Sequence, residues 1–288
     1  MQPTWGIDVT KPLDGLTALI TGAGREGGMG QATARRMAEA GATVVITDLA
    51  RDRPELRIDE THCLGDDLAK MQAFIDGLVA EFGMEGRALA LDVTDPDQAA
   101  AVVGSVVSEF GSIDVLFNNA GATTGVGRFM EQTDEQWDLS WQVNTMGTRR
   151  MSMLAIPHMA AGAGGVIINN ISVGGLISDA GYGAYCATKF GVTAITKLIA
   201  KEHGADGIRC VGICPGVIDT GMAVANRRLV AELEGVTDDQ AWDLMIDGIP
   251  LGVPGQADDV AQLVTFLASP AAAFISGALI PIDGGMLP

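Results

Sequence analysis

The chain is poor in positive charge and in cysteine. Its 18 lysine and arginine residues face 36 aspartate and glutamate residues, and the formal net charge is −18. Nucleic acids and anionic membranes attract basic surfaces, so this balance argues against both as partners. The four cysteines form no C-x-x-C motif and no zinc spacing with histidine, so no metal site is expected.

Long apolar runs are also missing. No stretch reaches the length that is needed to cross a bilayer. The first residues, MQPTWGIDVTKPLDG, lack both the basic and the apolar region of a signal peptide. Because the few cysteines suit a reducing compartment, we expect a cytoplasmic protein.

What the chain does contain is an alternation of short apolar runs with amphipathic segments. The runs, expected as strands, span 16–21, 43–47, 88–91, 113–117, 166–171, 208–213 and 278–282. The segments, expected as helices, span 31–40, 66–81, 96–110, 134–159, 184–203 and 257–268. This alternation predicts an α/β fold with a doubly wound parallel seven-stranded sheet, and right-handed crossovers give the strand order 3-2-1-4-5-6-7.

No linker divides the chain, so residues 1–288 are expected to form a single domain. Three segments depart from the regular alternation. Residues 1–12 form an N-terminal arm, and the polar stretch 51–66 is an insertion after the second strand. Residues 221–248, rich in methionine and leucine, are predicted to be a helical lid over a binding site. The apolar side chains expected to cover the site are Met222, Val224, Leu229, Trp242, Met245 and Ile246.

A glycine-rich turn joins the first strand to the first helix. Glycines such as Gly22 and Gly28 let the backbone approach a diphosphate, and the helix N-terminus supplies N–H donors. Asp48 follows the second strand, where a carboxylate can bond both hydroxyls of an adenosine ribose. The alternative is that Asp48 is an ordinary turn residue. Arg25, Arg51 and Arg53 are close in sequence and could instead cradle a phosphate.

Tyr185 and Lys189 are four residues apart, which places them on one face of the expected helix 184–203. A neighbouring ammonium favours the phenolate, so this spacing could make a general acid/base that works near neutral pH. Ser172 follows the fifth strand and could donate a hydrogen bond to a substrate oxygen. Tyr-x-x-x-Lys alone also occurs by chance in many helices, so its weight depends on the rest of the chain.

In this order and spacing, the motifs resemble those of the short-chain dehydrogenases/reductases over about residues 14–285. The motifs are the turn over 21–30, Asp92-Val93, the segment 118–121, Asn144, Ser172, Tyr185 with Lys189, and the segments 215–220 and 283–285. The resemblance implies that Tyr185 exchanges a proton with the carbinol oxygen and that Lys189 lowers its pKa and binds the nicotinamide ribose. It implies that Ser172 orients the carbonyl and that Asn144 holds a water linking Lys189 to solvent.

The resemblance also implies a set of cofactor contacts. These are Gly22, Gly28 and Met29 at the diphosphate, Asp48 and Leu49 beside the adenosine, Asp92 and Val93 at the adenine, Asn119, Ala120 and Gly121 along the ribose, Tyr185 and Lys189 at the nicotinamide, and Ile218 and Thr220 at the carboxamide. Two departures lie near the adenosine half. Arg25 and Glu26 lengthen the glycine turn by two residues, and the insertion 51–66 is similar to one in a subgroup that retains its nicotinamide and reduces a peptide-derived redox carrier.

The sequence therefore predicts an NAD-dependent oxidoreductase that interconverts a largely apolar secondary alcohol and its ketone. NAD rather than NADP is expected because Asp48 would repel a 2′-phosphate. A 3-oxoacyl thioester reductase and a non-catalytic NAD-binding regulator are the alternatives. The expected partners are a small-molecule substrate and further copies of the chain in a homotetramer. Arg227 and Arg228 in the lid could instead bind a carboxylate or phosphate of the substrate, or simply face solvent.

Overall fold

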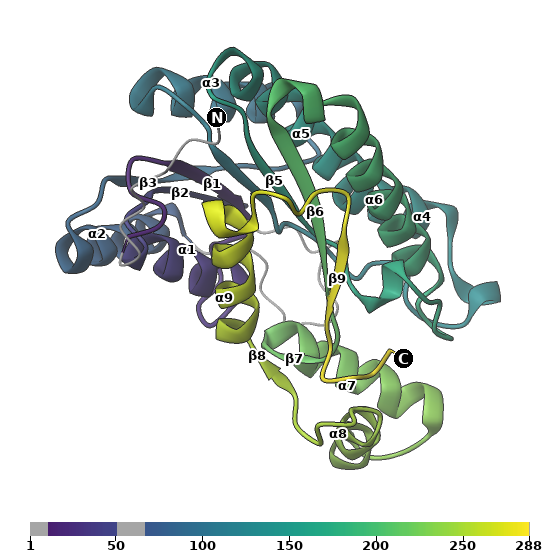
Figure 1. The fold of residues 1–288 in the computed structure, drawn as a ribbon. Coiled ribbons are helices and arrows are strands. Elements are labelled where there is room, and N and C mark those ends of the chain that lie inside the picture. Colours follow the sequence, from purple (N-terminus) through teal and green to yellow (C-terminus); the bar gives the residue numbers. More distant parts are fainter. Residues whose placement is uncertain (1–10, 51–66, 288) are drawn as a thin grey trace.

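The structure is a computed structural model that describes residues 11–50 and 67–287. Within these residues, a parallel sheet of seven strands has the order β3-β2-β1-β4-β5-β6-β9 (Figure 1). The strands are β1 (Thr17–Thr21), β2 (Thr43–Asp48), β3 (Gly86–Ala90), β4 (Val115–Asn118), β5 (Gly165–Asn170), β6 (Ile208–Pro215) and β9 (Leu279–Ile282). The predicted fold class and strand order are confirmed, with β9 as the seventh strand of the prediction.

Helices cover both faces of this sheet (Figure 1). Successive residues of a strand point to opposite faces, so Ala18 and Ile20 of β1 join one core while Leu19 joins the other. The first core packs against α1 (Met29–Glu39), α2 (Leu68–Phe82) and α9 (Ala257–Ala268). The second packs against α3 (Pro96–Phe110), α5 (Thr148–Ala161) and α6 (Gly183–Glu202). Strands buried on both faces explain the continuous apolar runs in the sequence.

The helix ends follow from local chemistry. Asp67 accepts a hydrogen bond from the backbone N–H of Ala69 at 3.0 Å, so it caps α2 rather than belonging to it. Gly83 ends the same helix with φ of 69°, a conformation that glycine adopts without strain. The helices predicted over 96–110 and 257–268 have the predicted bounds.

The long helix predicted over 134–159 is interrupted. It consists of α4 (Asp134–Ser140), a π-helical segment (Trp141–Gly147) and α5. A π-helical turn holds one residue more than an α-helical turn, and periodicity alone does not reveal this extra residue. The segment carries the predicted site residue Asn144 at its centre.

The lid predicted over 221–248 is a pair of helices, α7 (Gly221–Glu234) and α8 (Asp238–Asp247), beyond the end of the sheet (Figure 1). Two short strands that the sequence did not indicate, β7 (Ile218–Asp219) and β8 (Gly255–Gln256), pair at its base. The predicted insertion 51–66, with Arg51 and Arg53, and most of the N-terminal arm lie outside the described residues. No helix in the described part of the chain is long and apolar enough to cross a membrane.

Candidate active site

Two adjoining cavities lie at the carboxyl ends of the strands, where the chain leaves β1, β4, β5 and β6. Parallel strands bring these ends to one edge, and the order reverses between β1 and β4, where α/β sheets bind their ligands. The cavities share part of their lining, so together they form one elongated cleft. The shared residues are Met29, Asn119, Gly121, Thr220 and Met222.

The glycine turn lines the first cavity with Gly22 and Gly28, which have no side chains to cover the backbone. A β-carbon on Gly22 would lie 2.6 Å from the Cα of Ala120, so no side chain fits there. Gly28 caps α1 without a side-chain hydrogen bond, so no side chain blocks the N–H groups of the first turn. Exposed N–H donors at a helix start form a cradle that suits a phosphate group, and the turn therefore fits the diphosphate of a dinucleotide.

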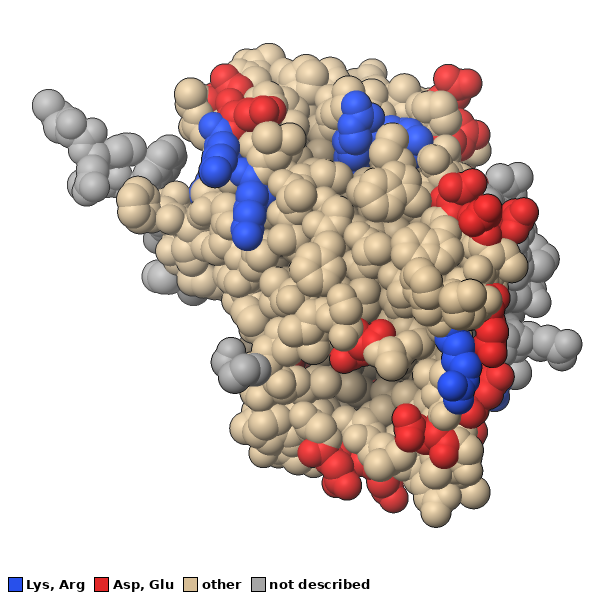
Figure 2. Space-filling view, turned by 90° about the vertical axis from the view of Figure 1, so that its right-hand side faces the viewer, with Lys and Arg blue, Asp and Glu red and all other residues tan. Residues whose placement is uncertain are grey.

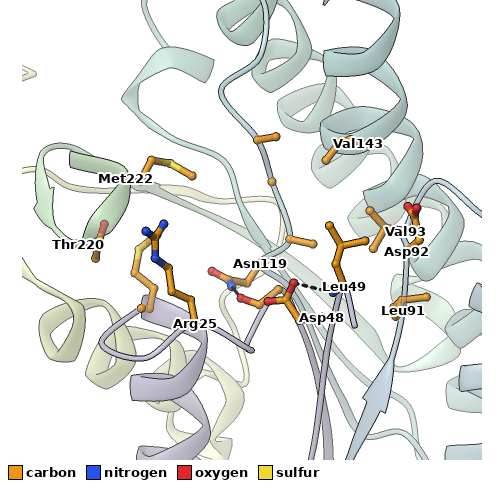
Figure 3. A pocket seen from close by; sticks show the side chains of 16 residues that line it. Arg25, Asp48, Leu49, Leu91, Asp92, Val93, Asn119, Val143, Thr220 and Met222 are labelled. Carbon is orange, nitrogen blue, oxygen red and sulfur yellow. Dashed lines mark hydrogen bonds between the residues drawn. The ribbon is translucent and has the colours of Figure 1, made fainter. Parts of the chain in front are cut away.

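Asp48 lies beside this turn in a fixed orientation. One of its carboxylate oxygens accepts the backbone N–H of Gly24 at 2.7 Å. The other accepts the backbone N–H of Leu49 at 2.7 Å, a bond that Figure 3 marks with a dashed line. A β-carbon on Gly24 would lie 2.7 Å from the Cβ of Asp48, so the glycine permits this close approach. Asp48 and Leu49 both line the first cavity.

Asp92 and Val93 line the far end of the same cavity (Figure 3). Asp92 is buried, and one of its oxygens accepts the backbone N–H of Thr94 at 3.0 Å and the hydroxyl of Thr94 at 2.6 Å. Val93 packs against Gly147, where a β-carbon would lie 2.8 Å from the valine side chain. The structure thus brings both predicted adenine-site residues to the cleft.

Two asparagines connect the glycine turn to Lys189. The amide of Asn119 donates to the carbonyls of Thr21 at 3.0 Å and Gly22 at 2.7 Å, which holds the start of the turn. Its carbonyl oxygen accepts the amide of Asn170 at 3.0 Å. The backbone carbonyl of Asn170 in turn accepts the Lys189 ammonium at 2.9 Å. Asn170 stands inside an apolar strand run, so sequence reasoning did not single it out.

Ser172, Tyr185 and Lys189 all line the second cavity, whose volume is about 380 Å³. Lys189 lies with its Nζ 5.6 Å from the centre of the Tyr185 ring, so the predicted pair does share one helix face. Ser172 has φ of 150°, which among the described residues is the only positive φ at a residue other than glycine. Strained backbone of this kind costs about 1–3 kcal/mol and gathers at functional sites.

The ionisation of the pair differs from the prediction that Lys189 lowers the pKa of Tyr185. Burial raises the pKa of the Tyr185 phenol to about 12, although a hydrogen bond with Ser172 opposes this rise. Burial also lowers the pKa of Lys189 to about 8. Desolvation favours the neutral form of both groups, and the ammonium is directed to the Asn170 carbonyl over the face of the ring.

Asn144 lies behind Lys189 rather than in the cavity wall. Its side-chain amide exchanges two hydrogen bonds with the backbone of Ala122, both 2.9 Å long, and donates a third to the Thr188 hydroxyl at 3.1 Å. Asn144 therefore joins the loop after β4 to α6. The water that the resemblance places at this residue stays a prediction.

The remaining cofactor-site predictions also fall at the cleft. Ala120, Gly121 and Thr220 line the first cavity, and Gly121, Ile218 and Thr220 line the second. A β-carbon on Gly121 would lie 3.4 Å from the Lys189 Nζ, so this glycine leaves room beside the amine.

The lid contributes apolar side chains to the second cavity, but only part of the predicted set. Met222 and Met245 line it, whereas Val224, which is 42% exposed, and Leu229, Trp242 and Ile246 do not. Ala223, Val230 and Leu244, which the sequence did not indicate, also line it from the lid. Arg227 pairs with Asp238 of α8 at 3.7 Å, and neither Arg227 nor Arg228 lines either cavity.

Comparison with known proteins places this site in a family. A family model described as enoyl-(acyl carrier protein) reductase matches residues 22–287. The 3-oxoacyl-(acyl-carrier-protein) reductase FabG of Thermotoga maritima is 34% identical over 278 residues, which covers 96% of this chain and 99% of the relative. Meso-2,3-butanediol dehydrogenase of Serratia marcescens is 34% identical over 274 residues, covering 94% of each. The crystal structure of an NAD⁺-bound xylitol dehydrogenase superposes with a TM-score of 0.84 at 26% identity, covering 95% of this chain and 99% of that one.

The chain belongs to the short-chain dehydrogenase/reductase family. It is an oxidoreductase of the kind that acts on CH–OH groups. The family assignment made from the motifs is thereby confirmed.

Proposed function

We propose that the protein is an NAD-dependent oxidoreductase that interconverts a largely apolar secondary alcohol and its ketone. The observation that carries the proposal is the meeting of Ser172, Tyr185 and Lys189 in a cavity that adjoins the glycine turn. The cofactor, when bound, would supply the hydride acceptor and, in its oxidised form, a positive charge that favours the phenolate.

In the proposed mechanism, Tyr185 takes the proton of the substrate hydroxyl on its phenol oxygen during oxidation and returns it during reduction. Its high pKa in this structure keeps the phenol protonated, which is the form that a ketone reduction needs. Ser172 donates a hydrogen bond to the substrate oxygen and so fixes its position beside the phenol. Lys189 binds the nicotinamide ribose and supplies positive charge, and Asn144 positions the helix that carries both.

NAD rather than NADP is proposed because of Asp48. Its carboxylate is held by the N–H groups of Gly24 and Leu49, so it cannot easily turn away from a ribose in the cavity. Of the three arginines that could offset its charge, Arg25 extends toward Thr220 and Met222 and away from Asp48 (Figure 3). We propose that Gly22, Gly28 and Met29 contact the diphosphate, and that Asp92 and Val93 contact the adenine.

A neutral, mostly apolar substrate fits the second cavity. Met222, Val230, Leu244 and Met245 cover it from the lid, and such side chains exclude water from the reacting atoms. The cavity wall also holds polar groups, among them Tyr182 and the exposed Asp179 at the rim. A carboxylate at the rim disfavours anionic substrates.

A 3-oxoacyl thioester reductase is the second candidate, because the relative from Thermotoga maritima carries that name. A net charge of −18 opposes docking of an acidic carrier protein, which is why we place this activity second. The two candidates are separated by measuring NADH formation from neutral secondary alcohols against NADH or NADPH consumption with a 3-oxoacyl thioester. A higher kcat/KM for the thioester would make the reductase the first candidate.

We also propose that the protein is a cytoplasmic homotetramer. Large apolar side chains are exposed on two groups of elements, and closed symmetric assembly would bury both groups. The first group lies on the π-helical segment, α5 and α6, and comprises Trp141, Met153, Phe190 and Leu198. The second lies on α9 and the chain just before and after it, and comprises Leu251, Val253, Phe266 and Phe274. Figure 2, taken from the side on which α4 and α6 lie, shows a broad central area without charged residues.

A further inference from the structure

The two residues that lengthen the glycine turn are accommodated by a β-turn. The carbonyl of Arg25 accepts the N–H of Gly28 at 3.2 Å, and Gly27 at the third position has φ of 69°. A glycine with positive φ at this position is typical of a type II turn. The turn directs the Arg25 side chain into the first cavity, which it lines.

The guanidinium of Arg25 crosses the cavity to the lid. Figure 3 shows the side chain extending from the glycine turn toward Thr220 and Met222. A β-carbon on Gly221, the first residue of α7, would collide with the Cζ and Nη2 atoms of Arg25. The guanidinium therefore lies in contact with the first turn of the lid, and Gly221 leaves the space that it occupies.

Positive potential converges at this point from three directions. The first turns of α1 and α7 contain no acidic residue, and neither helix has a side-chain hydrogen bond at its N-cap. Each helix start carries roughly half a positive charge, and Arg25 adds a full one. Of the two carboxylates that line the first cavity, Asp48 accepts the N–H of Gly24 in the turn itself, and Asp92 is bound to the N–H of Thr94 at the far end. The two helix starts and the Arg25 guanidinium thus lie together at the first cavity, and this arrangement favours an anionic ligand group.

We propose that Arg25 is a diphosphate clamp that joins the glycine turn to the lid. The inference rests on the proposed function, because the diphosphate is that of the dinucleotide. Arg25 binds the diphosphate from the side opposite the bare glycine backbone and, through the same anion, fixes the first turn of α7. Since α7 also contributes Met222 and Val230 to the substrate cavity, the cofactor must bind before that cavity takes its final shape.

The test compares ligands that differ in their phosphates, by isothermal titration calorimetry on the full-length protein. Adenosine, ADP, 2′-AMP and NAD are titrated into wild type, Arg25→Ala, Arg25→Lys and Arg228→Ala. The last variant removes the same charge from an exposed position on α7 that lines neither cavity. We expect Arg25→Ala to weaken ADP and NAD roughly 10- to 100-fold and to leave adenosine unchanged, because a hydrogen-bonded charge pair is lost. Arg25→Lys should lose less, and Arg228→Ala should match wild type.

Hydrogen exchange gives an independent readout of the lid. ADP should slow exchange in residues 221–234 of the wild type, and this effect should vanish in Arg25→Ala at a saturating ADP concentration. If the wild type binds ADP and Arg25→Ala binds it with the same affinity, the clamp is refuted while the proposed function stands. A loss confined to 2′-AMP would also overturn it, since Arg25 would then recognise a 2′-phosphate. If the wild type bound neither NAD nor ADP, the proposed function would fail together with the clamp.

Discussion

Replacing Asp48 should change which nicotinamide cofactor the enzyme prefers. A 2′-phosphate would place its charge beside the Asp48 carboxylate, whose two oxygens are held at 2.7 Å from the N–H groups of Gly24 and Leu49. Two negative charges about 4 Å apart repel by about 1 kcal/mol in water and about 4 kcal/mol at an effective dielectric of 20. Loss of the ribose hydrogen bonds adds to this, so wild type should favour NAD by about tenfold to a thousandfold.

The assay is kcat/KM for NAD and NADP with one alcohol, expressed as a ratio. Asp48→Asn removes the charge, but an amide has one acceptor oxygen, so one of the two N–H donors loses its partner. This structural damage lowers kcat/KM with both cofactors and so cancels in the ratio. The lost repulsion raises kcat/KM with NADP alone. Asp92→Asn removes the same charge at the far end of the cavity and should leave the ratio unchanged. A wild-type ratio near one, or a ratio that Asp48→Asn does not narrow, would refute the role of Asp48.

Four further predictions concern the chemistry, the backbone and the assembly. Tyr185→Phe should lower kcat by at least about 10²–10⁴-fold, because the proton acceptor is lost, while NAD affinity measured by calorimetry stays within a few fold. Ser172→Gly should have a free energy of unfolding about 1 kcal/mol higher than Ser172→Ala in urea denaturation. The reason is that glycine relieves about 1–3 kcal/mol of backbone strain, which exceeds its entropic cost of about 0.5–1 kcal/mol. Equal urea midpoints for the two variants would contradict the strain at Ser172. Lys189 has its pKa lowered to about 8, so between that pH and its ordinary 10.5 the unfolded chain binds more protons than the folded one. Burial of the charged amine therefore destabilises the folded protein below pH 8. Between pH 8 and 10.5, the unfolding free energy of the wild type should rise relative to that of Lys189→Met by up to roughly 1.4 kcal/mol per pH unit. Parallel curves of unfolding free energy against pH for the two proteins would count against this. Light scattering at micromolar concentration should give a tetramer, and a lone 29.8 kDa species would disprove the assembly.

The sheet and the position of the site were predictable because they depend on simple patterns. Strands buried on both faces appear as apolar runs such as the one leading to Asp48, and right-handed crossovers then restrict their order. Residues that follow parallel strands gather at one edge whatever the loops do. Ser172 and Asp48 could therefore be placed at the cleft from the sequence.

Features that depend on neighbours in space were not predictable in the same way. The direction of the Tyr185 pKa shift is set by burial in the folded site, which sequence spacing does not contain. Which lid residues face the cavity depends on how α7 and α8 pack, so Val230 lines it and Val224 does not. Asn170 was not predicted as a site residue because an asparagine inside an apolar run has no local sequence signature. The strands β7 and β8 are too short to have one.

The π-helical segment between α4 and α5 has a consequence for how this region tolerates change in length. Each helical residue advances the chain by about 100° around the axis, so one extra residue turns all that follows by that angle. With the extra residue present, Asn144 faces the loop at Ala122 while Met151 and Ala155 face the core beside α3. Deleting a single residue here would yield a more regular helix and would misalign one of these two faces. Indels between Ser140 and Thr148 are therefore expected to harm activity more than indels of the same size in the loops that join helices to strands.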